Sequence, residues 1–283
     1  MTKFSFLNRI DSCLQLFARE EVTLREKIFL LFNFYKILLL RKFNKRNIVD
    51  FMGYKIDYIS RSNLEGIIEE IFIKGDYFVK LENKSPTIID CGGNIGLSAL
   101  FFKRYYPTSR ITIFEPSKTT FYVLSKNIER NKLSGIKLIN AAVSDTKGDL
   151  IFYKNKRSPG SSTTISYSKS NSIGNDYVEE KIKSVLLSDY IDNEVDLLKV
   201  DIEGGENKVF KDLDSKNKLG KVKEIVFEYH DNISNTDNGL CEILEILEKN
   251  KFRTIIYGSD FALSSEKIKS RVSYHFMVRA YKV

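Results

Sequence analysis

The chain has 283 residues, of which 42% are hydrophobic and 29% are charged; these values exclude a wholly disordered chain, a collagen-like repeat and a multi-span membrane protein. The length predicts one large domain or two small ones, with enough buried surface to need no disulfide scaffold. Lysine and arginine (45) exceed aspartate and glutamate (37), and the net charge of +8 favours anionic partners, namely phosphates, nucleotide-sugars, acidic lipids or nucleic acid.

The first 50 residues contain no alternating strand pattern and are predicted to be helical, and a short strand is predicted at 53–59. Beyond this strand the pattern of a larger domain begins. We therefore expect residues 1–62 to form a helical N-terminal extension and residues 63–283 to form the main domain.

One segment of the extension, residues 28–40, is strongly apolar. It is interrupted by Asn33 and Lys36 and is too short to span a bilayer. Two interpretations stay open: a helix that packs on the main domain or in a dimer interface, or a peripheral membrane helix in which the basic residues of the region 28–46 contact lipid.

The main domain begins with a predicted helix at 63–73, and from residue 87 short apolar runs alternate with amphipathic helices. This alternation is typical of a parallel sheet covered on both faces. The predicted strands lie at 87–90, 111–114, 136–142, 149–153, 178–185, 195–201, 224–230, 253–257 and 274–281. The predicted helices of this region start at residue 97, cover 119–131, end near residue 213 and cover 239–249. A polar, serine-rich segment at 154–177 is predicted to be a long loop or lid.

Polar groups stand at the predicted carboxyl ends of four strands, where an open parallel sheet binds its ligands. They are Asp90 with the glycine turn 91–96, Glu115, the segment 201–206 and the segment 228–230. The glycine turn lets the backbone approach a ligand, although a tight strand-to-helix connection would also use it. Its spacing is G-G-x-x-G and not the G-x-G-x-x-G of dinucleotide sites. A carboxylate at Glu115 can accept both hydroxyls of an adenosine ribose, as in NAD and S-adenosylmethionine sites.

Four segments together resemble the FkbM-type methyltransferases, a family of class I S-adenosylmethionine-dependent methyltransferases. They are Asp90-Cys-Gly-Gly-Asn-Ile-Gly96, Phe114-Glu-Pro116, Asn140-Ala-Ala-Val-Ser-Asp145 and Leu198-Lys-Val-Asp-Ile-Glu-Gly-Gly-Glu206. The resemblance runs from about residue 64 to the end and includes Glu70-Ile-Phe-Ile-Lys-Gly-Asp-Tyr77 and Ser158-Pro-Gly-Ser-Ser-Thr163. Small apolar residues and Gly-Ala are more usual in the family where this chain has Cys91-Gly92-Gly93.

The resemblance implies an α/β fold, a Rossmann-like sheet in the order 3-2-1-4-5-7-6 with the last strand antiparallel. It also implies S-adenosylmethionine as cofactor. The residues that it assigns to the cofactor are Asp90, Gly92, Gly93, Asn94 and Gly96 for the methionine end, Glu115 for the ribose, Ala142 and Ser144 near the adenine, and Asp201.

A sugar hydroxyl needs a general base before it can attack a methyl group. The candidate bases or metal ligands are Asp201, Glu203, Glu206, Glu228 and His230, and we favour His230 or Asp201 as the base because histidine has a near-neutral pKa. Asp201, Glu203, Glu228 and His230 could together bind Mg²⁺, although no residue is assigned as a metal ligand. His275 is expected to be structural.

These observations predict an O-methyltransferase that acts on a hydroxyl of a sugar, nucleotide-sugar or glycan, with a phosphorylated acceptor suggested by the basic excess. The alternatives are a methyltransferase for another small molecule, a lipid or an amine, a nicotinamide-dependent oxidoreductase, and a non-catalytic binding protein. Nucleic acid is not expected, because Asp201-Ile-Glu-Gly stands where an Asn/Asp-Pro-Pro-aromatic motif would be. Three widely spaced cysteines and a poor signal sequence predict a cytoplasmic protein, which could form a homo-oligomer.

Overall fold

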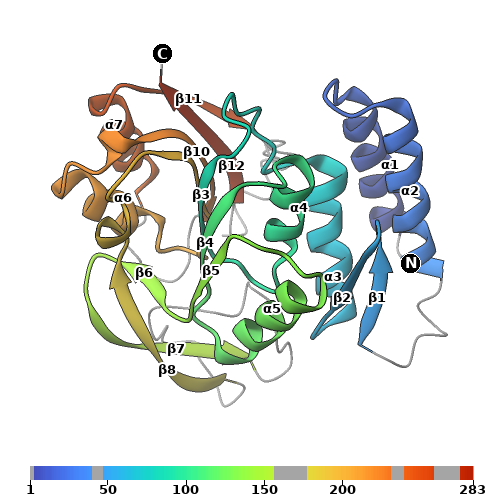
Figure 1. The fold of residues 1–283 in the computed structure, drawn as a ribbon, viewed down its shortest axis with the longest axis horizontal. Coiled ribbons are helices and arrows are strands. Elements are labelled where there is room, and N and C mark those ends of the chain that lie inside the picture. Colours follow the sequence, from blue (N-terminus) through green and yellow to red (C-terminus); the bar gives the residue numbers. More distant parts are fainter. Residues whose placement is uncertain (1–2, 40–46, 156–176, 231–238, 258–274, 283) are drawn as a thin grey trace.

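The computed structural model describes residues 3–39, 47–155, 177–230, 239–257 and 275–282 (Figure 1). At its centre lies a seven-stranded sheet. The strands are β3 (Thr87–Cys91), β4 (Arg110–Phe114), β5 (Ile136–Ile139), β9 (Val195–Val200), β10 (Val222–His230), β11 (Phe252–Tyr257) and β12 (His275–Lys282). The spatial order is β11-β12-β10-β9-β3-β4-β5.

The topology of this sheet confirms the predicted fold class. Numbered along the chain within the sheet, the strands stand in the order 3-2-1-4-5-7-6. The last strand, β12, runs antiparallel to both of its neighbours, β10 and β11, whereas the other ladders are parallel. The carboxyl ends of the parallel strands therefore meet at one edge, where the polar residues of the sequence motifs lie.

Helices cover both faces of the sheet, as the alternating pattern predicts. Helices α4 (Leu97–Tyr105) and α5 (Lys118–Arg130) lie on one face, and α6 (Glu206–Ser215) and α7 (Leu240–Lys249) lie on the other (Figure 1). Neighbouring side chains of a strand point to opposite faces, so that Ile88 belongs to one hydrophobic cluster and Ile89 to the other. All six residues of β9 are buried, which explains its nearly continuous apolar run.

A smaller sheet follows the third central strand, and here one predicted boundary is wrong. The strand predicted at 136–142 ends at Ile139, and Ala142 begins a new strand. The chain turns at Asn140, whose side-chain amide donates to the carbonyls of Glu115 and Pro116 at 2.8 and 3.1 Å. The small sheet has the order β6-β8-β7, with β6 (Ala142–Ser144), β7 (Gly148–Asn155) and β8 (Tyr177–Leu186). Strands β7 and β8 confirm the two strands predicted beside the long loop, and most of that loop lies outside the described residues.

The N-terminal region differs from the prediction in one element. Two helices are present, α1 (Lys3–Ala18) and α2 (Leu24–Leu39). Residues 40–46 of the expected helix lie outside the described residues. Residues 48–50 are expected to be helical and residues 53–59 to form one strand, but the chain forms a hairpin of β1 (Ile48–Phe51) and β2 (Tyr54–Asp57). Its two turn residues, Met52 and Gly53, have φ of 52° and 88°, the left-handed pair that a tight hairpin requires. Methionine rarely adopts this conformation, so the sequence carries a weak turn signal.

The extension packs onto the main domain. Leu30, Phe34 and Ile37 of α2 are each 3% exposed and belong to the same hydrophobic cluster as the helices beside the sheet. This face of α2 therefore agrees with the packing interpretation of the apolar segment. No helix in the described ranges is long and apolar enough to cross a membrane. The boundary after residue 62 stays a prediction.

The segment before the first central strand is helical, as predicted, but changes its winding. Helix α3 (Arg61–Ile68) continues as the π-helix η2 (Glu69–Lys74) and ends at Gly75 with φ of 78°. Short π-helical segments are frequent at functional sites. Asp76 and Tyr77, which follow it directly, return at the edge of the sheet described next.

Candidate active site

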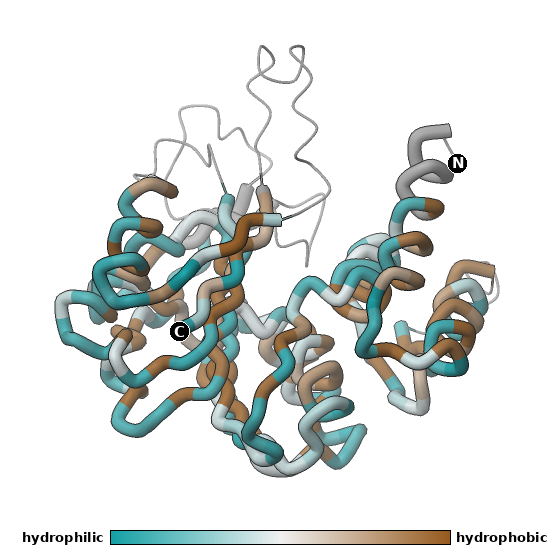
Figure 2. The backbone as a smooth tube through the Cα atoms, turned by 90° about the horizontal axis from the view of Figure 1, so that it is seen from above, coloured by the Kyte–Doolittle hydropathy of each residue, from teal (hydrophilic) through white to brown (hydrophobic). Residues whose placement is uncertain are grey.

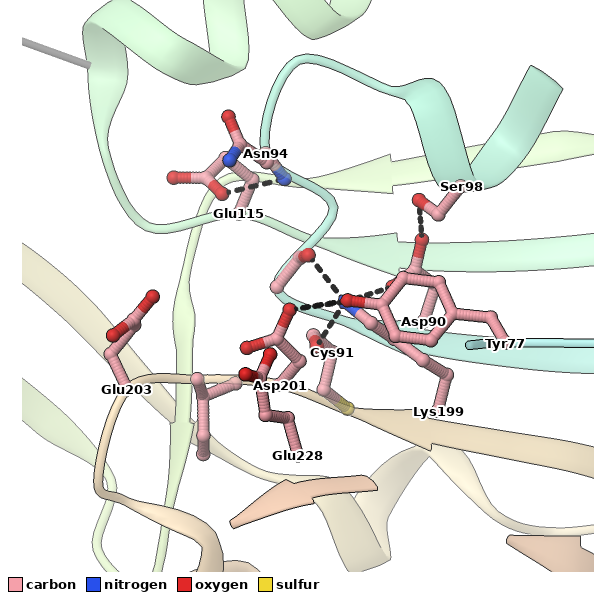
Figure 3. A network of polar contacts seen from close by, with 12 residues as sticks. Tyr77, Asp90, Cys91, Asn94, Ser98, Glu115, Lys199, Asp201, Glu203 and Glu228 are labelled. Atoms are coloured by element: carbon pink, nitrogen blue, oxygen red, sulfur yellow. Dashed lines mark hydrogen bonds and ion pairs between the residues drawn. The ribbon is translucent and has the colours of Figure 1, made fainter. Parts of the chain in front are cut away.

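A buried lysine lies at the centre of the polar edge of the sheet (Figure 3). Lys199, on β9, is 1% exposed and pairs with the fully buried carboxylate of Asp90 at the end of β3, at 3.1 Å. Its ammonium also donates to the carbonyl of Gly92 at 2.7 Å and to that of Cys91 at 3.2 Å. Since Asp90 also accepts a hydrogen bond from Ser98 at the start of α4, these contacts join two strands, the glycine turn and a helix.

Asp201 lies immediately beyond β9, on the open side of this lysine. Its Oδ2 accepts a hydrogen bond from Tyr77 at 2.6 Å and lies 3.6 Å from the ammonium of Lys199, which also sits 5.0 Å from the centre of the Tyr77 ring. Burial alone would raise the pKa of Asp201, but Lys199 and His230 outweigh it and hold that pKa below its usual value. Burial would lower the pKa of Lys199, yet Asp90 and Asp201 raise it above the usual range. Both Asp201 and Lys199 are therefore ionised at neutral pH.

The glycine turn is shaped by the packing of the protein itself. A Cβ atom at Gly92 would lie 1.8 Å from the carbonyl oxygen of Asp201, and one at Gly93 would lie 2.2 Å from Cγ2 of Ile113. Gly92 and Gly96 also have φ of 87° and 92°, a region that favours glycine. These residues bring the turn into contact with the ends of β9 and β4, so a tight connection explains Gly92 and Gly93.

Glu115 stands beside this turn at the end of β4. Its two carboxylate oxygens accept hydrogen bonds from the backbone N–H of Asn94 at 3.0 Å and of Ser117 at 2.9 Å. Within the described residues, the buried side-chain oxygen of Asn94 has no hydrogen-bond partner. Figure 3 shows Asn94 and Glu115 side by side. The arrangement concentrates acceptor oxygens where the sequence predicts hydroxyl donors of a ribose.

His230, at the end of β10, is surrounded by three carboxylates. Its Nδ1 lies 3.2 Å from Glu206, and its Nε2 lies 3.5 Å from Glu203 and 3.9 Å from Glu228. Burial would lower the pKa of His230, but the hydrogen bond with Glu206 and the charges of the three glutamates raise it to about 11. Glu203 is held with φ of 62°, an uncommon conformation for a side chain of this kind.

The structure thus brings most of the predicted catalytic residues together. Donor atoms of Asp201, Glu203 and His230 lie within 4.8 Å of one another, a spacing within reach of one small ligand. Ala142 and Ser144 lie on β6 and are buried, and the Ser144 hydroxyl donates to Asp145 at 3.1 Å. His275 lies at the start of β12, and its side chain is outside the described residues.

Sequence reasoning gave no role to several residues at this edge. Besides Lys199 and Tyr77, they include Glu70 and Asp76 from the segment around η2. The Glu70 side chain is exposed to solvent, but protein atoms surround its carboxyl group. Desolvation of this group, together with the charges of Glu228 and Asp201, raises the pKa of Glu70 to about 8. Desolvation likewise raises the pKa of Asp76 to about 6. The available signal was the 70–77 motif, in which acidic residues interrupt an apolar run.

The strand order and the residues at the carboxyl edge define a class I methyltransferase fold. A family model described as the methyltransferase FkbM domain matches residues 90–254. The chain is 31% identical over 204 residues to methyltransferase sdnD of Sordaria araneosa, covering 62% of this chain and 78% of that protein. It is 29% identical over 228 residues to methyltransferase 1 of Beauveria bassiana (strain ARSEF 2860), covering 74% and 85%.

Among solved structures, methyltransferase FkbM from Methylobacillus flagellatus KT is similar with a TM-score of 0.46 and 16% identity, over 89% of this chain and 58% of that one. The family match and the curated relatives decide the assignment: the chain belongs to the FkbM methyltransferase family. It is therefore a methyltransferase, and the alternative of a nicotinamide-dependent oxidoreductase is replaced by this assignment.

Proposed function

We propose that the protein is an S-adenosylmethionine-dependent O-methyltransferase that acts on a hydroxyl of a sugar, nucleotide-sugar or glycan. The observation that carries the proposal is the excess of carboxylates around the glycine turn. Asp201, Glu203, Glu206 and Glu228 lie at this edge, whereas Lys199 and His230 are the described cations among them. A negative site suits a cofactor whose reactive group is a sulfonium cation better than it suits a dinucleotide, which carries phosphates.

The residues around the turn fit the remainder of this cofactor. Glu115 would accept the ribose hydroxyls, and the buried Asn94 oxygen, which lacks a partner among the described residues, would accept a further donor. Asp90 is fully buried and paired, so it would support the methionine end through the backbone of the turn. When bound, the cofactor supplies an activated methyl group, so no covalent enzyme intermediate is required.

The chain must orient the acceptor hydroxyl and take up its proton. We propose Asp201 for this step. Tyr77 and Lys199 fix its carboxylate, and orientation of this kind can lower a barrier by about 7–11 kcal/mol. A hydroxyl oxygen that has received a methyl group is a far stronger acid than any carboxylic acid, so even a carboxylate with a lowered pKa accepts the proton. With a pKa of about 11, His230 is charged at neutral pH and serves better to hold the neighbouring carboxylates.

A divalent cation is a further proposal for the same corner. The donor set would be Asp201, Glu203 and the Nε2 atom of His230, with Glu206 holding the opposite ring nitrogen at 3.2 Å. A carboxylate that orients a ligating imidazole in this way is common in metal sites. One imidazole beside two carboxylates suits Mn²⁺ better than Mg²⁺, which prefers oxygen ligands. The cation would have to replace the proton on His230.

The proposed acceptor rests on the family resemblance and on this charge distribution. A phosphate placed among the carboxylates would be repelled, so a nucleotide-sugar would have to present its sugar to Asp201 and keep its phosphates away from this edge. The lysines expected to meet such phosphates belong to the segment 154–177, most of which lies outside the described residues.

Titration calorimetry and a product screen test the proposal. S-adenosylmethionine should bind the wild-type chain, NAD should not, and Glu115→Gln should weaken cofactor binding by about tenfold, the worth of a charge-assisted hydrogen bond. Incubation with a panel of sugars and nucleotide-sugars should yield a mass increase of one methyl group, lost in Asp201→Asn. Methylation of amine acceptors only would refute O-methylation, and absence of S-adenosylmethionine binding would refute the cofactor.

A further inference from the structure

The first two helices carry a large exposed apolar surface, which we term the α1–α2 face. Figure 2 shows hydrophobic residues along this edge of the molecule. Of the twelve large hydrophobic side chains exposed in the described parts of the chain, nine belong to it, and their exposed fractions range from 41 to 75%. They are Ile10, Leu14, Phe17, Leu24, Ile28, Phe29, Phe32, Tyr35 and Leu39. A concentration of this kind marks an interaction site rather than an ordinary surface.

The arrangement on α2 shows that this exposure follows the helical period. Leu24, Ile28, Phe32, Tyr35 and Leu39 recur every three or four residues and therefore form one stripe along the helix. The opposite side of the same helix is buried against the main domain, as described above. A helix that is apolar on both sides requires a second apolar neighbour. In the described structure the stripe is exposed, although the Tyr35 hydroxyl lies 3.6 Å from the sulfur of Cys13 on α1.

The charge around the stripe indicates what this neighbour is. The sequence from residue 36 to residue 49 contains five lysines and arginines and no acidic residue, whereas Lys27 is buried and donates to the carbonyl of Phe17. In the described part of α2, Arg25 and Lys36 are exposed and are neighbours in sequence of the stripe residues Leu24 and Tyr35. Aromatic and aliphatic side chains bordered by basic ones are the composition of helices that lie on anionic lipid. A second copy of the chain would instead bring the same basic groups face to face, because a two-fold interface pairs each patch with itself.

We infer that the α1–α2 face binds the surface of a membrane containing anionic lipids, with α2 lying in the plane of the interface. Sixteen residues give α2 a length of roughly 24 Å, and the stripe would reach the boundary between headgroups and acyl chains. Arg25 and Lys36 would extend toward lipid phosphates. This inference is independent of the methyl acceptor and of the cofactor.

Co-sedimentation with vesicles tests the inference. The full-length protein should bind vesicles that contain phosphatidylserine about tenfold more tightly than vesicles of phosphatidylcholine alone. The double variant Phe32→Ser, Leu39→Ser should lose about tenfold in vesicle affinity, as should Arg25→Glu, Lys36→Glu. The matched controls Tyr122→Ser, Ile255→Ser and Arg253→Glu alter exposed residues far from α2 in the sequence and should bind like wild type.

Several results would overturn the inference. They are a lack of binding to either vesicle, equal binding to both, and wild-type binding by the Phe32→Ser, Leu39→Ser variant. Light scattering coupled to size exclusion supplies the remaining outcome. A dimer that this variant dissociates, together with no vesicle binding by wild type, would assign the face to a second copy of the chain. Circular dichroism of each variant should show the wild-type helical content, which separates lost binding from lost folding.

Discussion

Replacement of Lys199 by methionine tests whether the buried ion pair organises the cofactor edge. Methionine keeps most of the volume of the lysine stem but removes the ammonium. The variant leaves the carboxylate of Asp90, which is fully buried, without its cation, and it leaves the carbonyls of Cys91 and Gly92 without their donor.

The expected loss is large because solvent cannot compensate. Both partners of this pair are at most 1% exposed, and removal of one partner of a buried pair costs about 3–5 kcal/mol of unfolding free energy. Lys223 offers a matched comparison, since it pairs with Asp196 at the same 3.1 Å but is 51% exposed. Lys223→Met should therefore cost only about 0–1 kcal/mol.

Urea unfolding followed by circular dichroism measures both free energies. The double variant Asp90→Asn, Lys199→Met should be more stable than the sum of the two single losses implies, by about 1–3 kcal/mol, because no lone buried charge remains. Equal effects of Lys199→Met and Lys223→Met, or strict additivity of the double variant, would refute the account of Lys199 as a buried counter-ion.

Three other predictions concern the same edge. First, the pKa of His230 is about 11 in the folded protein and 6.5 in the unfolded chain, so the stability that its charge contributes is fully present below pH 6.5 and is lost as pH rises toward 11. Between pH 8 and pH 10 the unfolding free energy of wild type should therefore fall faster than that of His230→Gln, by up to about 1.4 kcal/mol per pH unit. Parallel curves for the two proteins would contradict this. Second, Gly92→Ala should destabilise the fold by more than about 2 kcal/mol and weaken S-adenosylmethionine binding. Gly220→Ala should do neither, because the space around its Cβ position is open. Urea unfolding measures the stability of each variant, and calorimetry measures its cofactor binding. Third, a chelator should abolish turnover and Mn²⁺ should restore it if the proposed cation site is used, and unchanged turnover would refute that site.

The central fold could be predicted from the sequence because its signals are local and repeated. Each parallel strand is a short apolar run that ends in a polar or glycine-rich segment, and the strand order followed from the family resemblance. The hairpin of β1 and β2 could not be predicted in this way. Its turn depends on Met52 adopting a left-handed conformation, which tertiary packing imposes against the intrinsic preference of the residue. The end of β5 was also missed, because the Asn140 side chain that turns the chain acts on a neighbouring strand.

The candidate site was predictable where residues follow strand ends, as Glu115, Asp201 and His230 do. Interactions between distant segments were not predictable. Tyr77 contacts Asp201 across 124 residues of sequence, and no local pattern reveals that contact. Likewise, the sequence alone would place a lysine such as Lys199 of β9 at an exposed position. Its burial follows only from the contact with Asp90. The protonated state of His230 depends on three glutamates whose distances only the fold determines.

The side chain of Asn127 on α5 makes three hydrogen bonds, which reach two different parts of the molecule. Its amide donates to the carbonyl of Ile95 in the glycine turn at 2.7 Å and to the carbonyl of Asp57 in the N-terminal hairpin at 3.0 Å, while its oxygen accepts from the backbone N–H of Asp57 at 2.7 Å. The hairpin and the cofactor turn thus share one rigid support. A chain that began at residue 63 would lose the hairpin's share of these bonds, so removal of a segment distant from the chemistry should loosen cofactor binding first.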